Sequence, residues 1–539
     1  MNFSSQNITY QETGFFSKIV LDYISGNDLL KPFYQHAVSI DGIKAAIEER
    51  KKYSTNRKVL VDILQKQYAE IILTAKQTFN LQQLSNQNCF TITTAHQPNI
   101  FTGHLYFIYK ILHTVKLAEE YKKALPENNF VPVYYMGSED ADLEELGHVF
   151  INGEKHQWQT QQTGAVGRMK VDKALVKLID NIAGEVVVYP FGASIIAVIK
   201  DCYKEGVTIE QATFKLVNEL FKEYGVLIIL PDNAALKRLF IPVVEKELTE
   251  TFSYKQVEAS VTAFPKEYKV QASGRELNLF YLTDNSRERI IVENSQFQIP
   301  NQPAGRQGSK LQFSKQEIIS ELINHPERFS ANVILRPVFQ EMILPNIAFI
   351  GGGGEIAYWL ELKKVFEEVG VPYPVLVLRN SFLIIEKNHQ ALLDKLNFTV
   401  ADLFKTEEQL MNQLVKRESG LQLSLKNEMQ TLEGFYTTLQ HTATAIDSSL
   451  QKHTAALQTQ ALKKITALEK KMLKAEKKKF EAQQRQLQKL KIVLFPHNNL
   501  QERIENFIPF YAKWGDDFIK ALYENSLALE QQFIILEEL

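Results

Sequence analysis

The sequence predicts an α/β protein with a parallel-sheet core, two insertions into that core and a long α-helical coiled-coil arm. Short runs of β-branched and aromatic residues alternate with longer amphipathic segments through residues 90–379, as expected for strands and helices in alternation. One run, residues 226–230, is apolar at every position, as in a parallel strand covered on both faces. Residues 421–495 contain no proline and a single glycine, which favours long helices.

Composition and charge exclude several classes of protein. A length of 539 residues exceeds the usual size of one hydrophobic core, so we expect roughly two to four structural units. The net charge of −2 offers no electrostatic case for nucleic acid. Cys89 and Cys202 are the only cysteines, and no run of 18 apolar residues occurs. We therefore expect a cytoplasmic protein with buried thiols and without a disulfide framework or a membrane span.

The first candidate site follows the predicted strand at residues 90–94. A polar loop leads from this strand to an amphipathic helix that we expect to open at Thr102, which would cap it. Because a helix N-terminus offers free N–H groups at the carboxyl end of a strand, this loop is a candidate anion site. A plain strand–loop–helix connection is the alternative. The candidate binding residues are Thr94, Gln97, Asn99, Thr102, Gly103 and Lys110, and His96 and His104 are candidates for catalysis.

Carboxylates gather after the second predicted strand, residues 131–136. Gly137 ends that strand, and Ser138, Glu139, Asp140 and Asp142 follow at once. Carboxylates crowded into one turn repel each other, so a surface turn gains nothing from them, whereas an amine site or a metal–nucleotide site would use them. Asp232 also follows a strand, and for this residue we favour helix N-capping over ligand contact.

A turn of four glycines follows the predicted strand at residues 347–350. Consecutive glycines cost conformational entropy, so we expect them where backbone passes close to a ligand or takes positive φ repeatedly. A flexible surface loop is the alternative, because the turn matches neither the phosphate-loop pattern nor the dinucleotide fingerprint. The candidate binding residues here are Gly351, Gly352, Gly353, Gly354 and Glu355, with Arg336 and Gln340 as an anion fork and Tyr358 and Trp359 as a stacking wall.

The chain divides into four predicted parts. Residues 1–379 form the catalytic core, which begins with a mainly helical segment at 1–88 and carries insertions near 149–206 and 251–330, the second with a mobile tip at 301–310. Residues 380–420 connect this core to the arm at 421–495, and residues 496–539 form a helical tail that packs back on the core.

The arm has the hydrophobic spacing of a coiled coil. Apolar residues from Leu425 to Leu450 alternate steps of four and three, and a second register of sevens runs from Leu473 to Leu494. We expect the break near 455–462 to be a stutter or a helix corner, which leaves one long helix and a hairpin both open. Residues 461–491 carry a local charge of +8, for which a solvated face or a contact with the acidic core of the same protein is favoured over nucleic acid.

Three segments resemble the BshC family, the cysteine-adding enzymes of bacillithiol synthesis. They are TAHQPNIFTGHLYFIYK, VPVYYMGSEDADLEELGHV and RPVFQEMILPNIAFIGGGGEIAYWLELKKVFEEVGVPYPVLVLR, and the resemblance runs over essentially the full length. It implies a Rossmann-like core with connecting-peptide insertions, similar to class I aminoacyl-tRNA synthetases and nucleotidyltransferases, and a coiled-coil arm that makes a homodimer. It also implies a ligase that joins cysteine to the amine of glucosaminyl malate. Thr102-Gly103-His104 resembles the second half of the synthetase HIGH signature, and no KMSKS-like lysine loop is visible.

The implied amide bond requires an activated carboxyl group. A free carboxylate is a poor electrophile, so we expect an acyl-adenylate or acyl-phosphate; ATP with Mg²⁺ is the candidate cofactor, and no metal ligands are assigned. Glu139, Asp140 or Asp142 would hold the attacking ammonium and take its proton, or bind Mg²⁺. Arg336 would clamp a malate carboxylate. The alternatives are an amino-acid-activating or nucleotidyl-transferring enzyme with another acceptor, and a non-enzymatic coiled-coil scaffold.

Overall fold

The computed structural model describes residues 2–272, 274–300 and 311–539, so the predicted mobile tip at 301–310 lies outside the described residues. The chain forms two compact units: residues 1–384 with 499–539, and residues 385–498. In the part of the chain that the structure describes, no helix has the length and apolarity needed to cross a membrane.

A five-stranded parallel sheet forms the centre of the first unit. Its strand order is β14-β13-β2-β3-β6, and each neighbouring pair is parallel. This sheet confirms the predicted α/β fold class. The helices α3 (Ile40–Lys51) and α6 (Tyr106–Ala124) share one apolar core with the strands. The strands are β2 (Cys89–His96), β3 (Asn129–Met136), β6 (Leu227–Ile229), β13 (Asn346–Gly351) and β14 (Val375–Leu378).

The segment between β3 and β6 is a mostly helical insertion followed by a helix that returns to the sheet. Its elements are α7 (Leu143–Leu146), β4 (His148–Ile151), β5 (Glu154–Gln157), η3 (Val166–Arg168), α8 (Lys173–Val186), α9 (Gly192–Cys202), α10 (Ile209–Phe221) and η4 (Lys222–Tyr224). The strands β4 and β5 form a small antiparallel hairpin.

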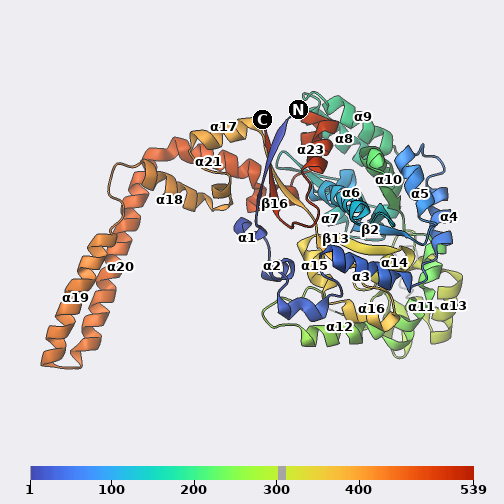
Figure 1. Cartoon of the computed structure of the whole chain (residues 1–539), viewed down its shortest axis with the longest axis horizontal. Helices are drawn as coiled ribbons and strands as arrows, with labels where there is room; N and C mark the ends of the chain where they lie inside the picture. Colours follow the sequence, from blue (N-terminus) through green and yellow to red (C-terminus); the bar gives the residue numbers. More distant parts are fainter. Residues whose placement is uncertain (1, 273, 301–310) are drawn as a thin grey trace. The chain divides into compact units, whose positions relative to one another are not determined.

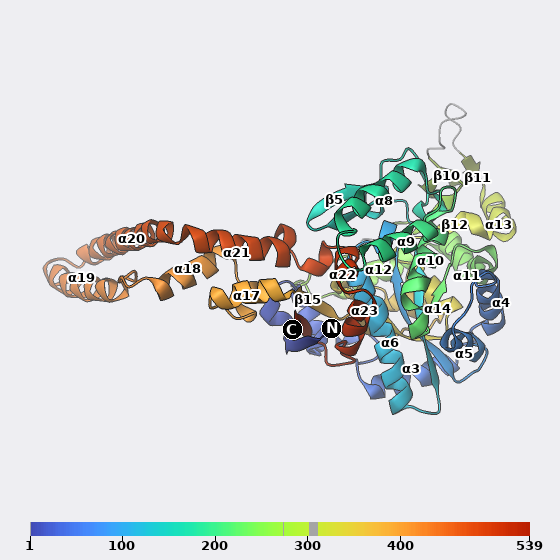
Figure 2. The ribbon, with the colours of Figure 1, turned by 90° about the horizontal axis from the view of Figure 1, so that it is seen from above.

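The segment between β6 and β13 carries two small antiparallel sheets, with strand orders β12-β7-β8 and β11-β10-β9. Figure 2 shows α8 and α9 of the first insertion on the same side of the first unit as β10 and β11 of the second. The two insertions touch, since the Thr163 hydroxyl donates to the Asn285 carbonyl over 2.8 Å. The elements are α11 (Ala234–Glu250), α12 (Phe252–Ala263), β7 (Leu279–Leu282), β8 (Arg287–Arg289), β9 (Ile291–Glu293), β10 (Gln296–Ile299), β11 (Leu311–Phe313), α13 (Lys315–Asn324), η5 (Pro326–Arg328), β12 (Phe329–Ala331) and α14 (Arg336–Ile343).

The two ends of the chain pair with each other, which the sequence did not predict. β1 (Phe3–Ile8) is antiparallel to β16 (Phe533–Glu538), and β16 also neighbours β15 (Ser381–Ile385). The expectations of a mainly helical start and a helical tail were therefore wrong at these strands. The reason is that β1 is polar and mostly exposed, so backbone pairing with a segment over 500 residues away, rather than its own hydrophobic pattern, makes it a strand.

Short helices fill the remainder of the first unit. Before β2 they are α1 (Tyr10–Thr13), α2 (Lys18–Ile24), η1 (Asp28–Phe33), α4 (Arg57–Gln67) and α5 (Ala75–Gln83). Beside the glycine turn lie α15 (Gly353–Trp359) and α16 (Lys363–Val369). In the tail they are η9 (Gln501–Arg503), α22 (Ile508–Trp514) and α23 (Asp516–Glu524).

The second unit is helical, and its arm is a hairpin. Its elements are α17 (Lys387–Lys395), η6 (Ala401–Phe404), α18 (Glu407–Glu418), α19 (Lys426–Ile446), α20 (Leu450–Lys477), η7 (Lys478–Phe480), α21 (Glu481–Leu494) and η8 (Pro496–Asn498). Figure 1 shows α19 and α20 side by side. A helix corner near 455–462 was wrong, because α20 is continuous there and the chain turns at 447–449, whereas a stutter in that helix stays a prediction. Asp447 makes this turn by accepting the Ser449 N–H over 2.8 Å.

A buried ion pair joins α3 to α14 beneath the sheet. Nη2 of Arg50 lies 2.7 Å from Oε2 of Glu341, and Nη1 donates to the Glu341 carbonyl over 2.8 Å. The two side chains are 2% and 0% exposed. Asn346, at the start of β13, donates to the other Glu341 oxygen over 2.8 Å. The carboxylate is therefore fully partnered by charge and hydrogen bonds.

Replacing Arg50 should destabilise the first unit strongly. The Arg50→Met variant leaves Glu341 buried without its cation, so we expect the free energy of unfolding, measured by urea denaturation, to fall by about 3–5 kcal/mol. The control is Lys51→Met on the same helix, which removes an exposed pair with Glu48 and should cost less than about 1 kcal/mol. Equal losses in the two variants would show that the buried pair contributes no more than a surface pair.

Candidate active site

A cavity of about 810 Å³ lies at the carboxyl ends of the parallel strands. The loops after all five strands reach its wall, as expected for ligand crevices in open α/β sheets. From β2, β3 and β6 come Ala95, His96, Gln97, Gly137, Ser138, Glu139, Asp140 and Pro231. From β13 and β14 come Gly352, Gly353, Gly354, Glu355 and Arg379. Its size falls in the upper part of the range for small-molecule sites, about 300–1,000 Å³.

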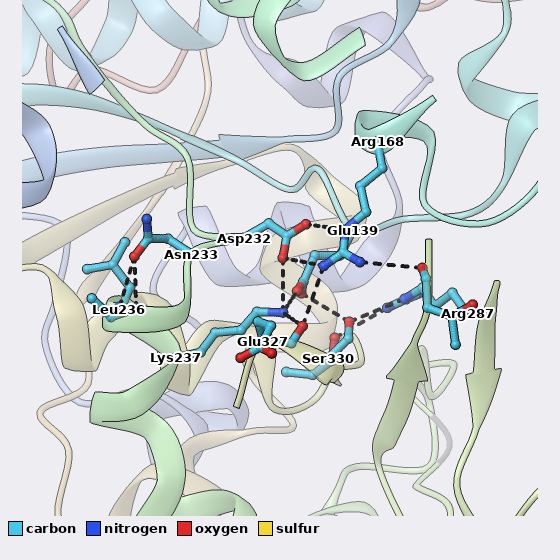
Figure 3. Close-up of polar contacts among 12 residues, drawn as sticks. Glu139, Arg168, Asp232, Asn233, Leu236, Lys237, Arg287, Glu327 and Ser330 are labelled. Carbon is cyan, nitrogen blue, oxygen red and sulfur yellow. Dashed lines mark hydrogen bonds and ion pairs between the residues drawn. The ribbon is translucent and has the colours of Figure 1, made fainter. Parts of the chain in front are cut away.

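One end of the cavity is acidic. Glu139 accepts the Ser330 hydroxyl over 3.0 Å at Oε2, and its other oxygen contacts the Lys237 ammonium (Figure 3). Asp140 accepts from the Gln97 amide over 3.2 Å and lies 3.4 Å from Arg287. Glu145 adds a third carboxylate to the wall, and burial raises its pKa. Two of these three carboxylates are therefore oriented by cations or polar groups of the second insertion and α11.

Asp232 belongs to the same charge network and does not cap α11. Asn233 is the cap, because its side-chain oxygen accepts the Ala235 N–H over 2.9 Å. Asp232 instead accepts two hydrogen bonds from Arg168, at 2.7 and 2.9 Å, and lies 3.2 Å from Nζ of Lys237. Burial by itself would raise the pKa of Asp232, but the positive charges of Lys237 and Arg168 outweigh it and hold this pKa below its usual value.

Glu210 lies behind the acidic end, on α10. Its side chain faces Ser138, with Asp232 and Glu139 nearby. Burial raises the pKa of Glu210 to about 7. Near neutral pH this carboxyl group is therefore close to half protonated, which limits the negative charge that accumulates around Glu139.

A second group of wall residues, which we call the arginine-rich end, lies around the glycine turn. These residues are Arg336, Arg379 and Arg503. Arg379 pairs with the buried Glu502 at 2.7 Å, and its guanidinium lies 4.8 Å from the centre of the Tyr106 ring. Arg275, Arg287 and Arg289 from the second insertion also line the wall, so six arginines face four carboxylates there, namely Glu139, Asp140, Glu145 and Glu355. This surplus of positive charge favours an anionic ligand.

His96 lies in the cavity wall, beside Tyr106 and Phe107. Burial, followed by the charge of Lys110, holds its pKa well below the usual value. The imidazole is therefore neutral at pH 7 and can donate or accept a hydrogen bond there.

Lys110 is connected to the glycine turn through Glu355. Its ammonium donates to the Ala95 carbonyl over 2.7 Å and pairs with Glu355 at 2.6 Å. The same Glu355 oxygen accepts the Gly352 N–H over 2.8 Å. Lys110 is buried outside the cavity wall, and burial lowers its pKa against the opposing effect of Glu355. It therefore joins the ends of β2 and β13 rather than meeting a ligand directly.

The glycine turn is regular structure, so the expectation of repeated positive φ was wrong. Gly351 ends β13, Gly352 precedes α15 with φ of −72°, and Gly353 and Gly354 begin that helix. A Cβ atom at Gly353 would lie 3.0 Å from a methyl group of Val20 on α2. Close packing against the N-terminal segment is therefore the reason for glycine at this position.

The loop after β2 does not present a free helix N-terminus. α6 begins at Tyr106 without a side-chain cap, and Thr102, the expected cap, has φ of 69°. The tail takes up the polar groups of this loop: the Leu105 N–H donates to the Glu505 carbonyl over 2.7 Å, and Asn506 donates to Phe101 and Gly103. The predicted capping by Thr102 was therefore wrong, and the Leu105 N–H is not free for an anion.

The structure brings eleven of the predicted residues into the cavity wall: His96, Gln97, Ser138, Glu139, Asp140, Arg336, Gly352, Gly353, Gly354, Glu355 and Tyr358. The other predicted residues lie outside this wall: Thr94, Asn99, Thr102, Gly103, His104, Lys110, Asp142, Gln340, Gly351 and Trp359. Thr94 donates to the Ile350 carbonyl over 2.8 Å, and Asp142 caps α7 by accepting the Glu145 N–H over 3.0 Å. His104 binds the Ile504 carbonyl through Nδ1 over 3.0 Å.

Trp359 and Gln340 are core residues, which corrects two predictions. The Trp359 ring stacks on Phe349 at 4.4 Å between centroids, so it cannot serve as a wall for a ligand. Gln340 is buried and donates to Glu341 over 2.9 Å, while it accepts from Arg336 over 3.3 Å. The anion fork therefore reduces to Arg336, which also donates to the Tyr358 hydroxyl over 2.8 Å.

Sequence reasoning missed several residues of the wall. Arg379 directly follows β14, so the rule that selected Glu139 could have selected it. Phe15, Phe16 and Arg503 come from the two ends of the chain and carry no local signal. The missed residues also include Tyr106, Glu145, Arg275, Arg287 and Arg289.

Comparison with known proteins covers nearly the whole chain. The family model described as "Bacillithiol biosynthesis BshC, N-terminal Rossmann-like domain" matches residues 3–380, and "Bacillithiol biosynthesis BshC, C-terminal coiled-coil domain" matches residues 382–538. These matches confirm the Rossmann-like core, the coiled-coil part and the resemblance seen in the sequence.

Three curated relatives carry the name "Putative cysteine ligase BshC". The one from Flavobacterium johnsoniae is 39% identical over 98% of this chain and 99% of its own length. Those from Flavobacterium psychrophilum and Christiangramia forsetii are 38% and 36% identical, each over 98% of this chain and over 99% and 98% of their own lengths.

The raised pKa of Glu210 predicts a pH-dependent stability. A native pKa of about 7 against an unfolded value near 4.5 means that the native state binds the extra proton, so this stabilisation is complete below about pH 4.5 and is lost as pH rises to 7. Glu210→Gln has no such proton to lose. Between pH 5 and pH 8, the free energy of unfolding of the variant should therefore rise relative to the parent by about 2–3 kcal/mol, measured by urea denaturation. A difference independent of pH would contradict this assignment.

Proposed function

Because the chain belongs to the bacillithiol biosynthesis BshC family, we propose that it is a ligase that adds cysteine to the amine of glucosaminyl malate, forming an amide in the last step of bacillithiol synthesis. The observation that carries this proposal is that the wall of one cavity holds both carboxylates and a surplus of arginines. Glucosaminyl malate has the complementary charges, an ammonium on the sugar and two carboxylates on the malate.

The acidic end suits the amine. Glu139 and Asp140 lie in the wall within reach of a bound ammonium, and both are oriented by neighbouring side chains. For the amine to attack, it must lose a proton, and a carboxylate at hydrogen-bond distance is a suitable acceptor. Glu139 is the candidate base, because it is the more deeply buried of the two carboxylates.

The arginine-rich end suits the malate. Guanidinium groups bind carboxylates through two parallel hydrogen bonds and stay charged at any physiological pH. Arg336 presents its guanidinium beside Tyr358, and Arg379 is held by Glu502 beneath the glycine turn. Arg503 supplies a third positive charge from the tail. Together they would fix the malate and leave the amine at the acidic end.

Cysteine must arrive with an activated carboxyl group. The new C–N bond forms as the bond between the carbonyl carbon and a leaving oxygen breaks, and AMP or phosphate is a suitable leaving group. We propose ATP with Mg²⁺ as the activating system. The surplus of arginines over carboxylates in the wall and the room in an 810 Å³ cavity support a phosphate-bearing second ligand.

The arm supports a homodimer, which we propose as the assembled form. Within the second unit, α19 has no buried residue, and large apolar side chains stay exposed along the hairpin. Phe435 is 59% and Ile446 is 79% exposed. Leu439, Leu457 and Leu468 add to this exposed apolar surface. A hairpin from a second copy would cover them, as in other helical coiled coils.

The two free buried thiols, Cys89 and Cys202, suit the reducing cytoplasm that we propose as the location.

Mass spectrometry tests the proposed reaction. Purified protein with cysteine, glucosaminyl malate, ATP and Mg²⁺ should form a product heavier by one cysteinyl residue, and a parallel tube without ATP should form none. Product in both tubes would remove ATP from the proposal. Product in neither, with amino-acid-dependent ATP–pyrophosphate exchange, would favour an activating enzyme with another acceptor.

Light scattering tests the homodimer. The full chain should have about twice the mass of one copy, and Phe435→Glu with Ile446→Glu on α19 should reduce it to one copy, because charged side chains cannot enter a dry apolar interface without a large desolvation cost. The control replaces Lys463 and Lys470, both exposed, with glutamate. A parent protein with the mass of one copy would contradict the proposed assembly.

A further inference from the structure

Lys237 is a buried lysine that the proposed reaction does not yet use. It lies on α11, its side chain is only 4% exposed, and its ammonium contacts the Glu139 carboxylate (Figure 3). It also lies 3.2 Å from Oδ1 of Asp232 and donates to the Glu327 carbonyl over 3.0 Å. All its polar partners are therefore acceptors, and two of them are carboxylates.

The surroundings of Lys237 contain little room for water. A cavity of only about 10 Å³ adjoins Lys237 and Glu139. This volume is at the lower limit for one water molecule. Its other walls are apolar: Phe240, Val244, Leu322, Pro326, Phe329, Ala331 and Phe339. In such a place the attraction between Lys237 and Glu139 is weakly screened.

The contact with Lys237 leaves the other Glu139 oxygen directed to the substrate cavity. Oε1 of Glu139 faces the ammonium, and Oε2 accepts the Ser330 hydroxyl over 3.0 Å. A carboxylate oxygen can accept two hydrogen bonds, so Oε2 keeps capacity for a further donor. The side chain is 15% exposed and forms part of the cavity wall. Glu139 is thus held at one oxygen while the second can meet an ammonium.

Lys237 is itself held in place by both insertions and the core. Asp232, at the end of β6, binds Lys237 on one side and the Arg168 guanidinium on the other, through two hydrogen bonds. Arg168 belongs to the first insertion. Ser330, which binds Glu139, belongs to the second and also accepts from Arg287 over 3.3 Å. A chain of charges therefore runs from Arg168 through Asp232 and Lys237 to Glu139.

We propose that Lys237 is a positioning residue, which holds the Glu139 carboxylate turned toward the cavity so that its second oxygen binds the substrate ammonium. This inference rests on the proposed function. Lys237 does not touch the substrate, since the Glu139 carboxylate lies between its ammonium and the cavity. Removal of Lys237 should lower kcat/KM for the amine substrate and leave KM for cysteine unchanged.

Steady-state kinetics with varied amine or cysteine tests this role. Lys237→Met should lower kcat/KM for the amine by at least about 100-fold, since one partner of a buried pair is lost, while KM for cysteine stays within about 2-fold. Lys237→Arg, which keeps the charge, should recover at least about 10-fold of this loss. Lys246→Met is the matched control, because Lys246 lies on the same helix in a partly exposed pair with Glu368, and it should keep parental values. Equal losses for both substrates would reduce Lys237 to a structural residue and overturn the proposal.

Asp232→Asn is a second variant that tests the same role if the Lys237→Met protein does not fold. This variant keeps Lys237 and weakens only the contact between Asp232 and the Lys237 ammonium. We therefore expect kcat/KM for the amine to fall by about 10-fold, with unchanged KM for cysteine. An unchanged kcat/KM for the amine in Asp232→Asn would count against the charge chain.

Crystal structures of the parent and the Lys237→Met or Asp232→Asn protein separate this inference from the proposed reaction. If the parent makes no product, the proposed function fails, but the positioning role is still decided by the structures. The inference requires that the Glu139 carboxylate leaves Ser330 when Lys237 is lost or loosened. A Glu139 side chain in its parental place would overturn it.

Discussion

Because the five strands of the sheet are parallel, the loops that follow them all lie at one edge of the sheet, and the site depends on this arrangement. His96, Glu139 and Arg379 are separated by up to 283 residues in the sequence, yet they line one cavity because their strands run in the same direction. The backbone groups of these strands are paired with neighbouring strands, so the strand ends are rigid. A rigid edge can carry charged side chains in set positions without ordering a loop for each of them.

Positive and negative side chains can lie together around this cavity because buried charges there form ion pairs with a neighbouring residue. Asp232 is paired with Arg168 and Lys237, Arg379 with Glu502, and Lys110 with Glu355. A buried charge without such a partner costs several kcal/mol, so these pairs are needed before either end can present charge to a ligand. The pairs also join segments that are far apart in the sequence. The electrostatic pattern of the cavity therefore depends on the placement of both insertions and the tail.

The loop after β2 shows how a distant segment changes the meaning of a local motif. In isolation, a strand followed by a polar loop and a helix is an anion site. Here the tail residues Ile504, Glu505 and Asn506 occupy the polar groups of the loop, and Arg503 beside them reaches the cavity instead. The positive charge expected of a helix N-terminus is thus supplied by arginine side chains. The C-terminal segment is part of the site, although it lies about 400 residues from the loop.

Local pattern was enough for the five parallel strands, the long helices of the arm, the carboxylates at Glu139 and Asp140 and the family resemblance. Each of these depends on periodicity or on residues that are adjacent in the chain, and the sequence by itself contains both. Only the tertiary structure decided that Lys237 and Arg168 hold the acidic end, that Trp359 is a core residue and that β1 pairs with β16. The reason is physical. Burial, charge partners and backbone pairing between remote segments are properties of the assembled fold, and a lysine on an amphipathic helix has the same local pattern whether it faces solvent or a carboxylate.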